Sequence, residues 1–158
     1  MNLRIEKAAP KDIPQIVALI GEFAEFEKLS EFCQVTENHL RETIFGKKRF
    51  VNCLVAFADD VSVGYALFYP VFKSFRGERS MFLEDLYVSP TMRGQGFGLK
   101  MLKEVARAAK QQNCARMDWQ ALKWNAPTIK FYENLGAEFQ DENLDFNLRG
   151  AAFERLAA

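Results

Sequence analysis

The segment VSPTMRGQGFGLK, residues 88–100, restricts the fold of this 158-residue chain more than any other part of its sequence. It places glycines at 94, 96 and 98, directly after an apolar run and directly before a segment with helical periodicity. Glycine costs backbone entropy, but it permits conformations and close approaches that other residues resist. Three alternate glycines therefore predict a turn that some other group approaches closely.

The apolar periodicities on both sides of this turn predict a mixed α/β domain. Alternating or short apolar runs predict strands at 3–7, 51–58, 61–70, 82–88 and 115–122, and two further short strands within 137–149. Helical spacing predicts helices from Pro10 through Phe23 and at 36–45, 99–112 and 127–136. Because the sequence has no internal repeat or linker, we expect one domain over 1–158, with the glycine turn at the ligand side of the sheet.

A glycine-rich turn that opens a helix favours an anion, because backbone N–H groups and the positive end of the helix dipole point outward. Phosphate is the usual occupant, and Arg93 adds a positive charge at the edge of the turn. A Walker A loop is excluded, since no lysine followed by serine or threonine stands at the required spacing after Gly94. A dinucleotide fingerprint is weakly supported, since the spacing is GxGxG and Asp118 falls within an expected strand. A glycine connection without a ligand is the simplest alternative.

Composition excludes several classes of protein. Lysine plus arginine and aspartate plus glutamate number 21 each, so no net charge draws the chain to nucleic acid or to an anionic membrane. Three scattered cysteines and a single histidine, His39, can assemble neither a disulfide framework nor a zinc site, so we expect no metal. The charged start of the chain is unlike a signal peptide, and no window reaches the about 18 apolar residues of a membrane span. We therefore expect a cytoplasmic protein.

Three segments stand out together, FLEDLYV (82–88), RGQGFG (93–98) and WNAPTIKFYENLGA (124–137). With these segments the sequence resembles the GNAT superfamily of N-acetyltransferases, and within it the diamine (spermidine/spermine-type) acetyltransferase group, where similar segments occur in the same order and with similar separations. The likeness spans most of the chain, and the combination is highly specific because independent segments must agree. The resemblance implies a mixed, mostly antiparallel sheet that is splayed at its centre and flanked by helices.

The resemblance also implies how acetyl-CoA is bound. The glycine turn would hold its pyrophosphate, and the preceding strand would pair with its pantetheine arm, because a strand splayed from its neighbour offers unpaired backbone groups. The residues implied in cofactor binding are Leu86, Tyr87, Val88, Arg93, Gly94, Gln95, Gly96, Phe97, Gly98, Leu99, Asn125, Thr128 and Tyr132.

Acetyl transfer to an amine requires a neutral amine, a stabilised oxyanion and a proton for the departing thiolate. An alkylammonium with a pKa near ~10.4 is almost fully protonated at pH 7, so a nearby carboxylate must take its proton, directly or through water. Glu84 and Asp85 are the candidates, and as neighbours on a strand they are expected to face opposite sides, with only one facing the cleft. The resemblance selects Glu84 as base, Tyr132 as the acid for the thiolate and the Leu86 N–H as oxyanion donor.

In the resembling group the acceptor is a polycation bound in an acidic groove. Lys73 stands near a position where that group has an acidic residue, so we expect it to repel a polycation and to favour acceptors that also carry a carboxylate. Glu27 follows Phe26 where the group has an aromatic-acidic pair. The predicted substrate-binding residues are Glu27, Glu84, Asp85 and Asp118.

These observations predict an acetyl-CoA-dependent N-acetyltransferase that acts on a small primary amine, either a diamine or polyamine or a lysine-like amino acid, without a covalent enzyme intermediate. The resemblance implies a homodimer. A protein or peptide N-acetyltransferase is an alternative, which would leave the acceptor groove open near residues 26–35. A non-catalytic acyl-CoA-binding module is another, and the presence of both Glu84 and Tyr132 argues against it.

Overall fold

The computed structural model describes residues 2–158, and the chain divides into two compact units, Met1–Gln120 and Ala121–Ala158. The first unit contains a five-stranded sheet in the order β1-β2-β3-β4-β5. Its strands are β1 (Leu3–Lys7), β2 (Asn52–Ala58), β3 (Val61–Lys73), β4 (Glu78–Val88) and β5 (Cys114–Trp119). Neighbouring strands are antiparallel except for β4 and β5, which are parallel. The predicted mixed, mostly antiparallel sheet flanked by helices is confirmed.

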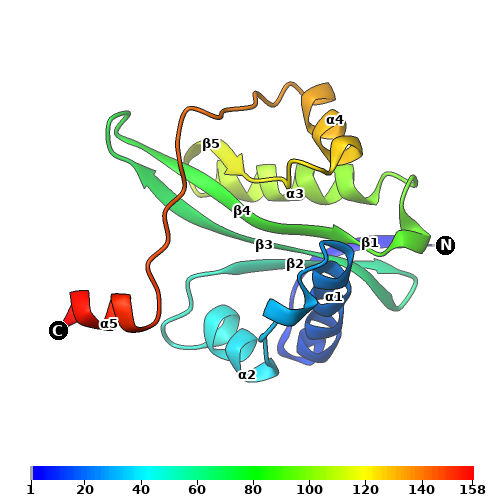
Figure 1. The fold of residues 1–158 in the computed structure, drawn as a ribbon. Coiled ribbons are helices and arrows are strands. Elements are labelled where there is room, and N and C mark those ends of the chain that lie inside the picture. Colours follow the sequence, from blue (N-terminus) through cyan, green and yellow to red (C-terminus); the bar gives the residue numbers. More distant parts are fainter. Residues whose placement is uncertain (1) are drawn as a thin grey trace. The chain divides into compact units, whose positions relative to one another are not determined.

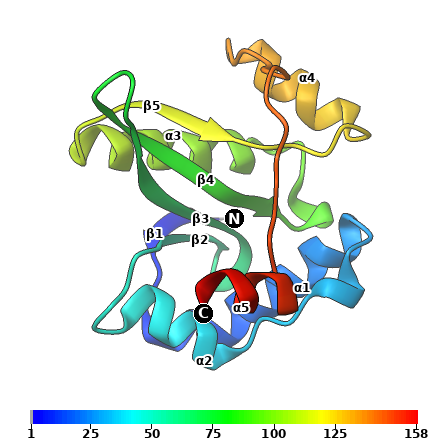
Figure 2. The same ribbon diagram turned by 60° about the vertical axis from the view of Figure 1, so that its left-hand side comes forward.

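Helices cover both faces of this sheet (Figure 1, Figure 2). On one face lies α3 (Phe97–Gln111), which buries apolar residues at helical spacing, Phe97, Met101, Leu102, Val105 and Ala109. On the other face lie α1 (Ile13–Phe26), α2 (Glu37–Leu40) and the π-helical turn η3 (Arg41–Phe45). Period-2 alternation along the strands supplies apolar side chains to both faces.

A buried core lies beneath α1 and α2. It consists of the buried residues Ile13, Ile16, Leu19, Leu40, Ile44, Cys53, Val55, Tyr65 and Tyr87. Each large apolar side chain that is fully buried stabilises a fold by about 1.5–3 kcal/mol. Packing against α1 therefore holds the side chains on this face of β3 and β4, such as Tyr65 and Tyr87, in fixed positions.

Strands β3 and β4 extend further than the sequence predicted. They form a long hairpin whose turn is at residues 74–77, and their pairing includes Lys73 opposite Glu78. The apolar pattern predicted that the third strand ends at Pro70 and that the fourth begins at Phe82, because charged residues interrupt the pattern between these two positions. The tip of this hairpin includes exposed positions such as Phe72 and has no need of apolar alternation, so periodicity alone underestimates the length of its strands.

The sheet splays between β4 and β5, next to its edge rather than at its centre as expected. Their parallel pairing ends at Leu83 opposite Trp119. Within the part of the chain that the structure describes, the remainder of β4, residues 84–88, has a paired neighbour only in β3. The splay leaves one side of this stretch of β4 without a neighbouring strand, directly before the glycine turn.

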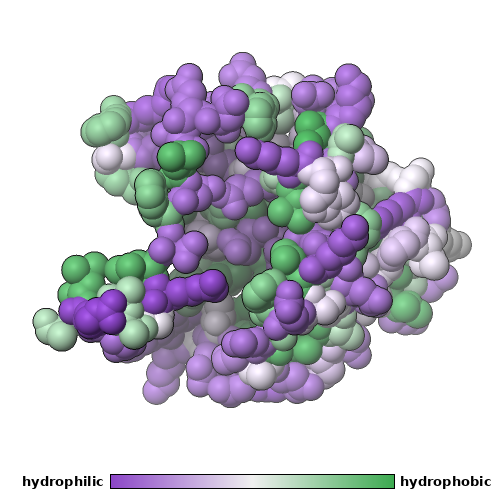
Figure 3. Space-filling model, in the orientation of Figure 1, coloured by the Kyte–Doolittle hydropathy of each residue, from purple (hydrophilic) through white to green (hydrophobic). Residues whose placement is uncertain are grey.

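The second unit contains the helices α4 (Ala126–Asn134) and α5 (Ala151–Ala157). The prediction of two short strands at 137–149 is wrong, since no strand is formed there, and α5 was not anticipated. The segment alternates apolar and polar residues, but this pattern forms a strand only when a partner supplies hydrogen bonds. The space-filling view shows apolar side chains on α5, where Phe153 and Leu156 are exposed (Figure 3).

Among residues 2–158 no helix combines the length and the apolar character that crossing a bilayer requires.

Candidate active site

The glycine turn follows the 3₁₀ turn η4 (Pro90–Met92) and runs into α3, so that Gly98 is the second residue of that helix. Gly94 and Gly96 have φ angles of +76° and +81°, which side chains disfavour, and Gly96 is the N-cap of α3. Gly98 has no such constraint, and a Cβ added at any of the three would meet no heavy atom within 4 Å. The turn is therefore an open cradle at a helix N-terminus. The backbone at Gly98 does not require glycine, so the effect of glycine there is to leave the space beside the turn without a side chain.

Arg93 connects this turn to β4 and to α1. Its Nε donates a hydrogen bond to the carbonyl oxygen of Val88 over 3.0 Å. Its guanidinium lies 4.2 Å from the ring centroid of Phe26 and 5.7 Å from that of Tyr87. Stacking of a cation on aromatic faces contributes about 0.5–2 kcal/mol. Arg93 is thus a positioned charge beside the turn rather than a mobile one.

The other residues near this turn that were predicted to bind the cofactor differ in how far their side chains are buried. The side chains of Tyr87 and Phe97 are buried, so only their backbone groups face the splay or the turn. The Tyr87 hydroxyl donates to Glu22 over 3.2 Å. Gln95 is exposed, whereas Leu86 and Leu99 are half-buried.

Glu84 and Asp85 lie on the same side of the sheet, so the prediction that they face opposite sides is wrong. The register shifts by one residue at this point, because Leu67 pairs with Asp85 and Phe68 pairs with Leu83, which makes Glu84 the extra residue of a β-bulge. A bulge interrupts the alternation of side chains along a strand. The bulge therefore gathers two carboxylates where regular pleating would present one.

Two tyrosines of β3 hold these carboxylates in place. The hydroxyl of Tyr65 donates to Oδ2 of Asp85 over 2.9 Å, and the hydroxyl of Tyr69 donates to Oε2 of Glu84 over 2.8 Å. Tyr65 and Tyr69 are four residues apart on one strand and so share a face. Burial, followed by the neighbouring carboxylates, raises the pKa of Tyr69 to about 12, so this phenol stays protonated and keeps donating.

Asp85 is the most strongly perturbed acid of the cluster. Its pKa is raised to about 6, chiefly by burial; the hydrogen bond from Tyr65 opposes the rise, and the negative charges of Glu84 and Glu27 add to it. Burial also raises the pKa of Glu27, which caps the C-terminus of α1. Near neutral pH the three carboxylates together create a strongly negative site that favours a cation. We refer to Glu27, Glu84 and Asp85 as the acidic cluster.

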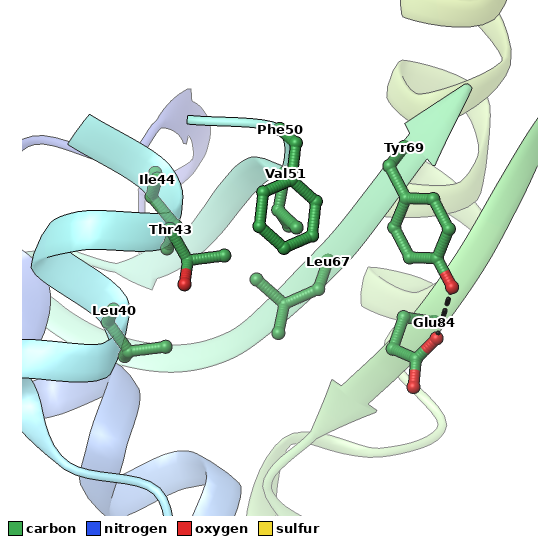
Figure 4. A pocket seen from close by; sticks show the side chains of 8 residues that line it. All are labelled: Leu40, Thr43, Ile44, Phe50, Val51, Leu67, Tyr69 and Glu84. Atoms are coloured by element: carbon green, nitrogen blue, oxygen red, sulfur yellow. Dashed lines mark hydrogen bonds between the residues drawn. The ribbon is translucent and has the colours of Figure 1, made fainter. Parts of the chain in front are cut away.

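A pocket of about 270 Å³ opens beside Glu84 between α2, η3 and the sheet (Figure 4). Its lining residues are Leu40, Thr43, Ile44, Phe50, Val51, Leu67, Tyr69 and Glu84. Sequence reasoning assigned only Glu84 to the site. The others come from four separate segments with ordinary core patterns, and the one unusual signal nearby is the π-helical turn, a feature that often marks functional sites but cannot be read from the sequence.

Asp118 lies apart from the acidic cluster, on β5. It accepts hydrogen bonds from Ser80 and Arg116, and Nζ of Lys73 lies 3.3 Å from its Oδ2. Burial raises the pKa of Asp118, but these partners outweigh burial and lower it overall. The positive charges of Lys73 and Arg116 thus offset the charge of Asp118. Asp118 therefore attracts a substrate cation less strongly than an isolated carboxylate would. Its role in substrate binding stays a prediction.

Lys73, which was expected to select acceptors by charge, lies far from the predicted substrate-binding residue Glu27. Glu27 lies close enough to Tyr65 for its negative charge to raise the pKa of Tyr65, and Lys73 stands eight positions after Tyr65 on β3. At about 3.3 Å per residue the two ends of this stretch are roughly 26 Å apart. Lys73 pairs with Asp118 instead, which offsets the positive charge that was expected for an acceptor carboxylate.

The remaining predicted residues belong to the second unit. Asn125 is the N-cap of α4, and its side-chain oxygen accepts a hydrogen bond from the backbone N–H of Thr128 over 3.4 Å. Tyr132 lies on α4 with its ring centroid 5.3 Å from that of Phe131. The capping interaction accounts for Asn125 structurally. The cofactor roles of Asn125 and Thr128 and the acid role of Tyr132 stay predictions.

Glu84 and Asp85 begin the part of β4 that has no partner in β5, and the glycine turn that follows this strand is an open cradle at a helix N-terminus. Residues 19–137 match the model of the acetyltransferase (GNAT) family. The chain belongs to this family, whose members use acetyl-CoA as donor, and it is an N-acetyltransferase.

Relatives with similar sequences cover nearly the whole chain. Thialysine N-epsilon-acetyltransferase of Mus musculus is 38% identical, over 99% of this chain and 98% of its own length. L-ornithine N5-acetyltransferase of Arabidopsis thaliana is 26% identical, over 99% of this chain and 88% of its own. A solved integron cassette protein from the mobile metagenome of V. cholerae has a TM-score of 0.82 at 26% identity, over 99% of this chain and 98% of its own.

Proposed function

We propose that this enzyme transfers the acetyl group of acetyl-CoA directly to the primary amine of a small acceptor, a diamine or a lysine-like amino acid, at the acidic cluster. The observation that carries the proposal is the bulge that places Glu84 and Asp85 together beside the splay of β4. The names of the relatives, which describe acetyltransferases of thialysine and ornithine, support a small amine that carries an alkyl stem.

The acidic cluster would perform two tasks. Asp85 and Glu27 attract the alkylammonium, and Glu84 takes its proton so that the nitrogen can bond to the acetyl carbon while the carbon–sulfur bond breaks. Tyr69 occupies one oxygen of Glu84 and leaves the other for the amine, since a carboxylate offers about four acceptor sites. In this proposal Leu86 N–H holds the oxyanion, and Tyr132 gives its proton to the thiolate and is restored by the second proton, which the nitrogen loses as the amide forms.

The glycine turn fits the pyrophosphate of acetyl-CoA, because backbone N–H groups, a helix N-terminus and Arg93 converge where a Cβ would have open space. When bound, acetyl-CoA supplies an activated acetyl thioester. We propose that residues 93–99 hold its phosphates and that the backbone of residues 86–88 holds its pantetheine arm. Asn125 and Thr128 would contribute from the second unit.

The proposal is tested by following thiol release from acetyl-CoA over a panel of amines, with cofactor affinity measured by calorimetry in parallel. Gly98→Glu should abolish acetyl-CoA binding, because it places a carboxylate in the cradle. Gly98→Ala is the matched control, since the added Cβ meets nothing within 4 Å and should leave affinity within a few-fold of the wild type. A folded Gly98→Glu protein with wild-type affinity would contradict the assignment of the turn.

Two further parts of the proposal concern the whole molecule. The resemblance to the diamine acetyltransferase group supports a homodimer, and the three scattered free cysteines support a location in the reducing cytoplasm. Light scattering after size-exclusion chromatography tests the dimer, and a monomer at micromolar concentration would count against it.

A further inference from the structure

The pocket beside Glu84 is charged at one end and mostly apolar elsewhere. Of its eight lining residues, Glu84 alone carries a charge, and it lies at one end next to Tyr69 (Figure 4). Five of the others have apolar side chains, Leu40, Ile44, Phe50, Val51 and Leu67. A molecule that fills this pocket while its ammonium meets Glu84 must lay the rest of its length against hydrocarbon.

The apolar part of the pocket has a fixed shape. Leu40 and Ile44 belong to the buried core, so the floor cannot rearrange to admit water freely. The carbonyl oxygen of Thr43, within the π-helical turn, accepts hydrogen bonds from the backbone N–H groups of Phe50 and Val51 over 3.1 and 3.4 Å. These bonds fold the loop before β2 back over the pocket and place Phe50 at its rim, where the ring is 68% exposed.

This arrangement discriminates between acceptors by their second charge. The terminal ammonium of a diamine that enters the pocket would lie against apolar side chains and lose its hydration, with no carboxylate among the lining residues at that end. A monoamine of the same length presents a methyl group or a ring there and gains from burial. A volume of about 270 Å³ is at the small end of ligand sites, which suits a compact acceptor.

We propose that this pocket binds the apolar tail of the acceptor, so that short alkyl and arylalkyl monoamines form an additional substrate class and are favoured over diamines of equal length. The inference rests on the proposed function, because it assumes that Glu84 receives the reacting amine.

The first test compares matched amines by thiol release from acetyl-CoA. We expect kcat/KM for n-pentylamine to exceed that for 1,5-diaminopentane at least tenfold, because the two share a five-carbon chain and the diamine adds a terminal ammonium. Along the series from propylamine to pentylamine, kcat/KM should rise about fourfold per methylene, which corresponds to burial of one CH₂. Equal or higher kcat/KM for the diamine, or no rise along the series, would overturn the inference.

The second test changes the charge of the pocket wall. Thr43→Asp should raise kcat/KM for the diamine and lower it for pentylamine, whereas Thr43→Asn has nearly the same shape without the charge and should not invert the ratio. Circular dichroism and acetyl-CoA affinity verify that both variants are folded. An unchanged ratio of the two substrates in a folded Thr43→Asp protein would show that the tail lies elsewhere.

The outcomes separate this inference from the proposed function. If no amine of either type releases thiol although acetyl-CoA binds, amine acetylation itself fails. If diamines or lysine-like amino acids are acetylated with clear preference over matched monoamines, amine acetylation stands and the assignment of the apolar pocket fails.

Discussion

Replacing the buried carboxylate of the acidic cluster should stabilise the protein while it weakens acceptor binding. Asp85 has a pKa of about 6 in the folded chain against an ordinary value of 3.8. The folded state therefore binds more protons than the unfolded state between these values, and stability falls as pH rises through this window. Each pKa unit corresponds to about 1.4 kcal/mol, so ionised Asp85 costs the fold about 3 kcal/mol above pH 6, an order-of-magnitude figure.

Asp85→Asn removes this cost and keeps an oxygen that can accept the hydrogen bond from Tyr65. The gain in unfolding free energy should be about 3 kcal/mol at pH 8 and about half of that at pH 5, where folded Asp85 is still mostly protonated. Urea denaturation of both proteins at the two pH values measures it. In the same variant kcat/KM for an amine acceptor should fall, because the cluster loses a negative charge.

Asp60→Asn serves as the matched control for losing one surface charge, since the side chain of Asp60 is 98% exposed. The reasoning is refuted if Asp85→Asn is destabilising at pH 8, or if its gain is the same at pH 5 and pH 8. In either case burial would not be what raises the pKa of Asp85, and the carboxylate would belong to the packing of the sheet rather than to an acceptor site.

Two further outcomes follow from the assignments above. Tyr132→Phe keeps the ring and removes the acid, so kcat should fall by about 10²–10⁴ while calorimetry shows little change in acetyl-CoA affinity; a variant with most of its kcat would leave Tyr132 a packing residue. Asp118→Asn should lower the unfolding free energy at pH 7 by about 1 kcal/mol, and the loss should shrink as pH falls, because the pKa of Asp118 is lowered in the fold; urea denaturation at pH 7 and pH 4 that shows no such difference would make its pairing with Lys73 and Arg116 energetically unimportant.

Local signals in the sequence were sufficient for the parts of the enzyme that depend on local chemistry. Glycines at 94 and 96 indicated positive φ angles and a turn before a helix, because few other residues tolerate that backbone. Apolar periodicity placed the principal helices and strands, since burial of one face has a period that can be read directly. The family followed from segments whose residues are adjacent in the chain.

The tertiary structure alone decided how the site is assembled. The bulge at Glu84 depends on the register between β3 and β4, which no local pattern encodes, and it reversed the expected orientation of Glu84 and Asp85. The apolar pocket joins α2, η3, the loop before β2 and the sheet, so its residues looked like ordinary core positions. Lys73 likewise looked like a selectivity residue until strand pairing placed it beside Asp118, because the partner of a long charged side chain is set by the residues that neighbouring strands bring within reach.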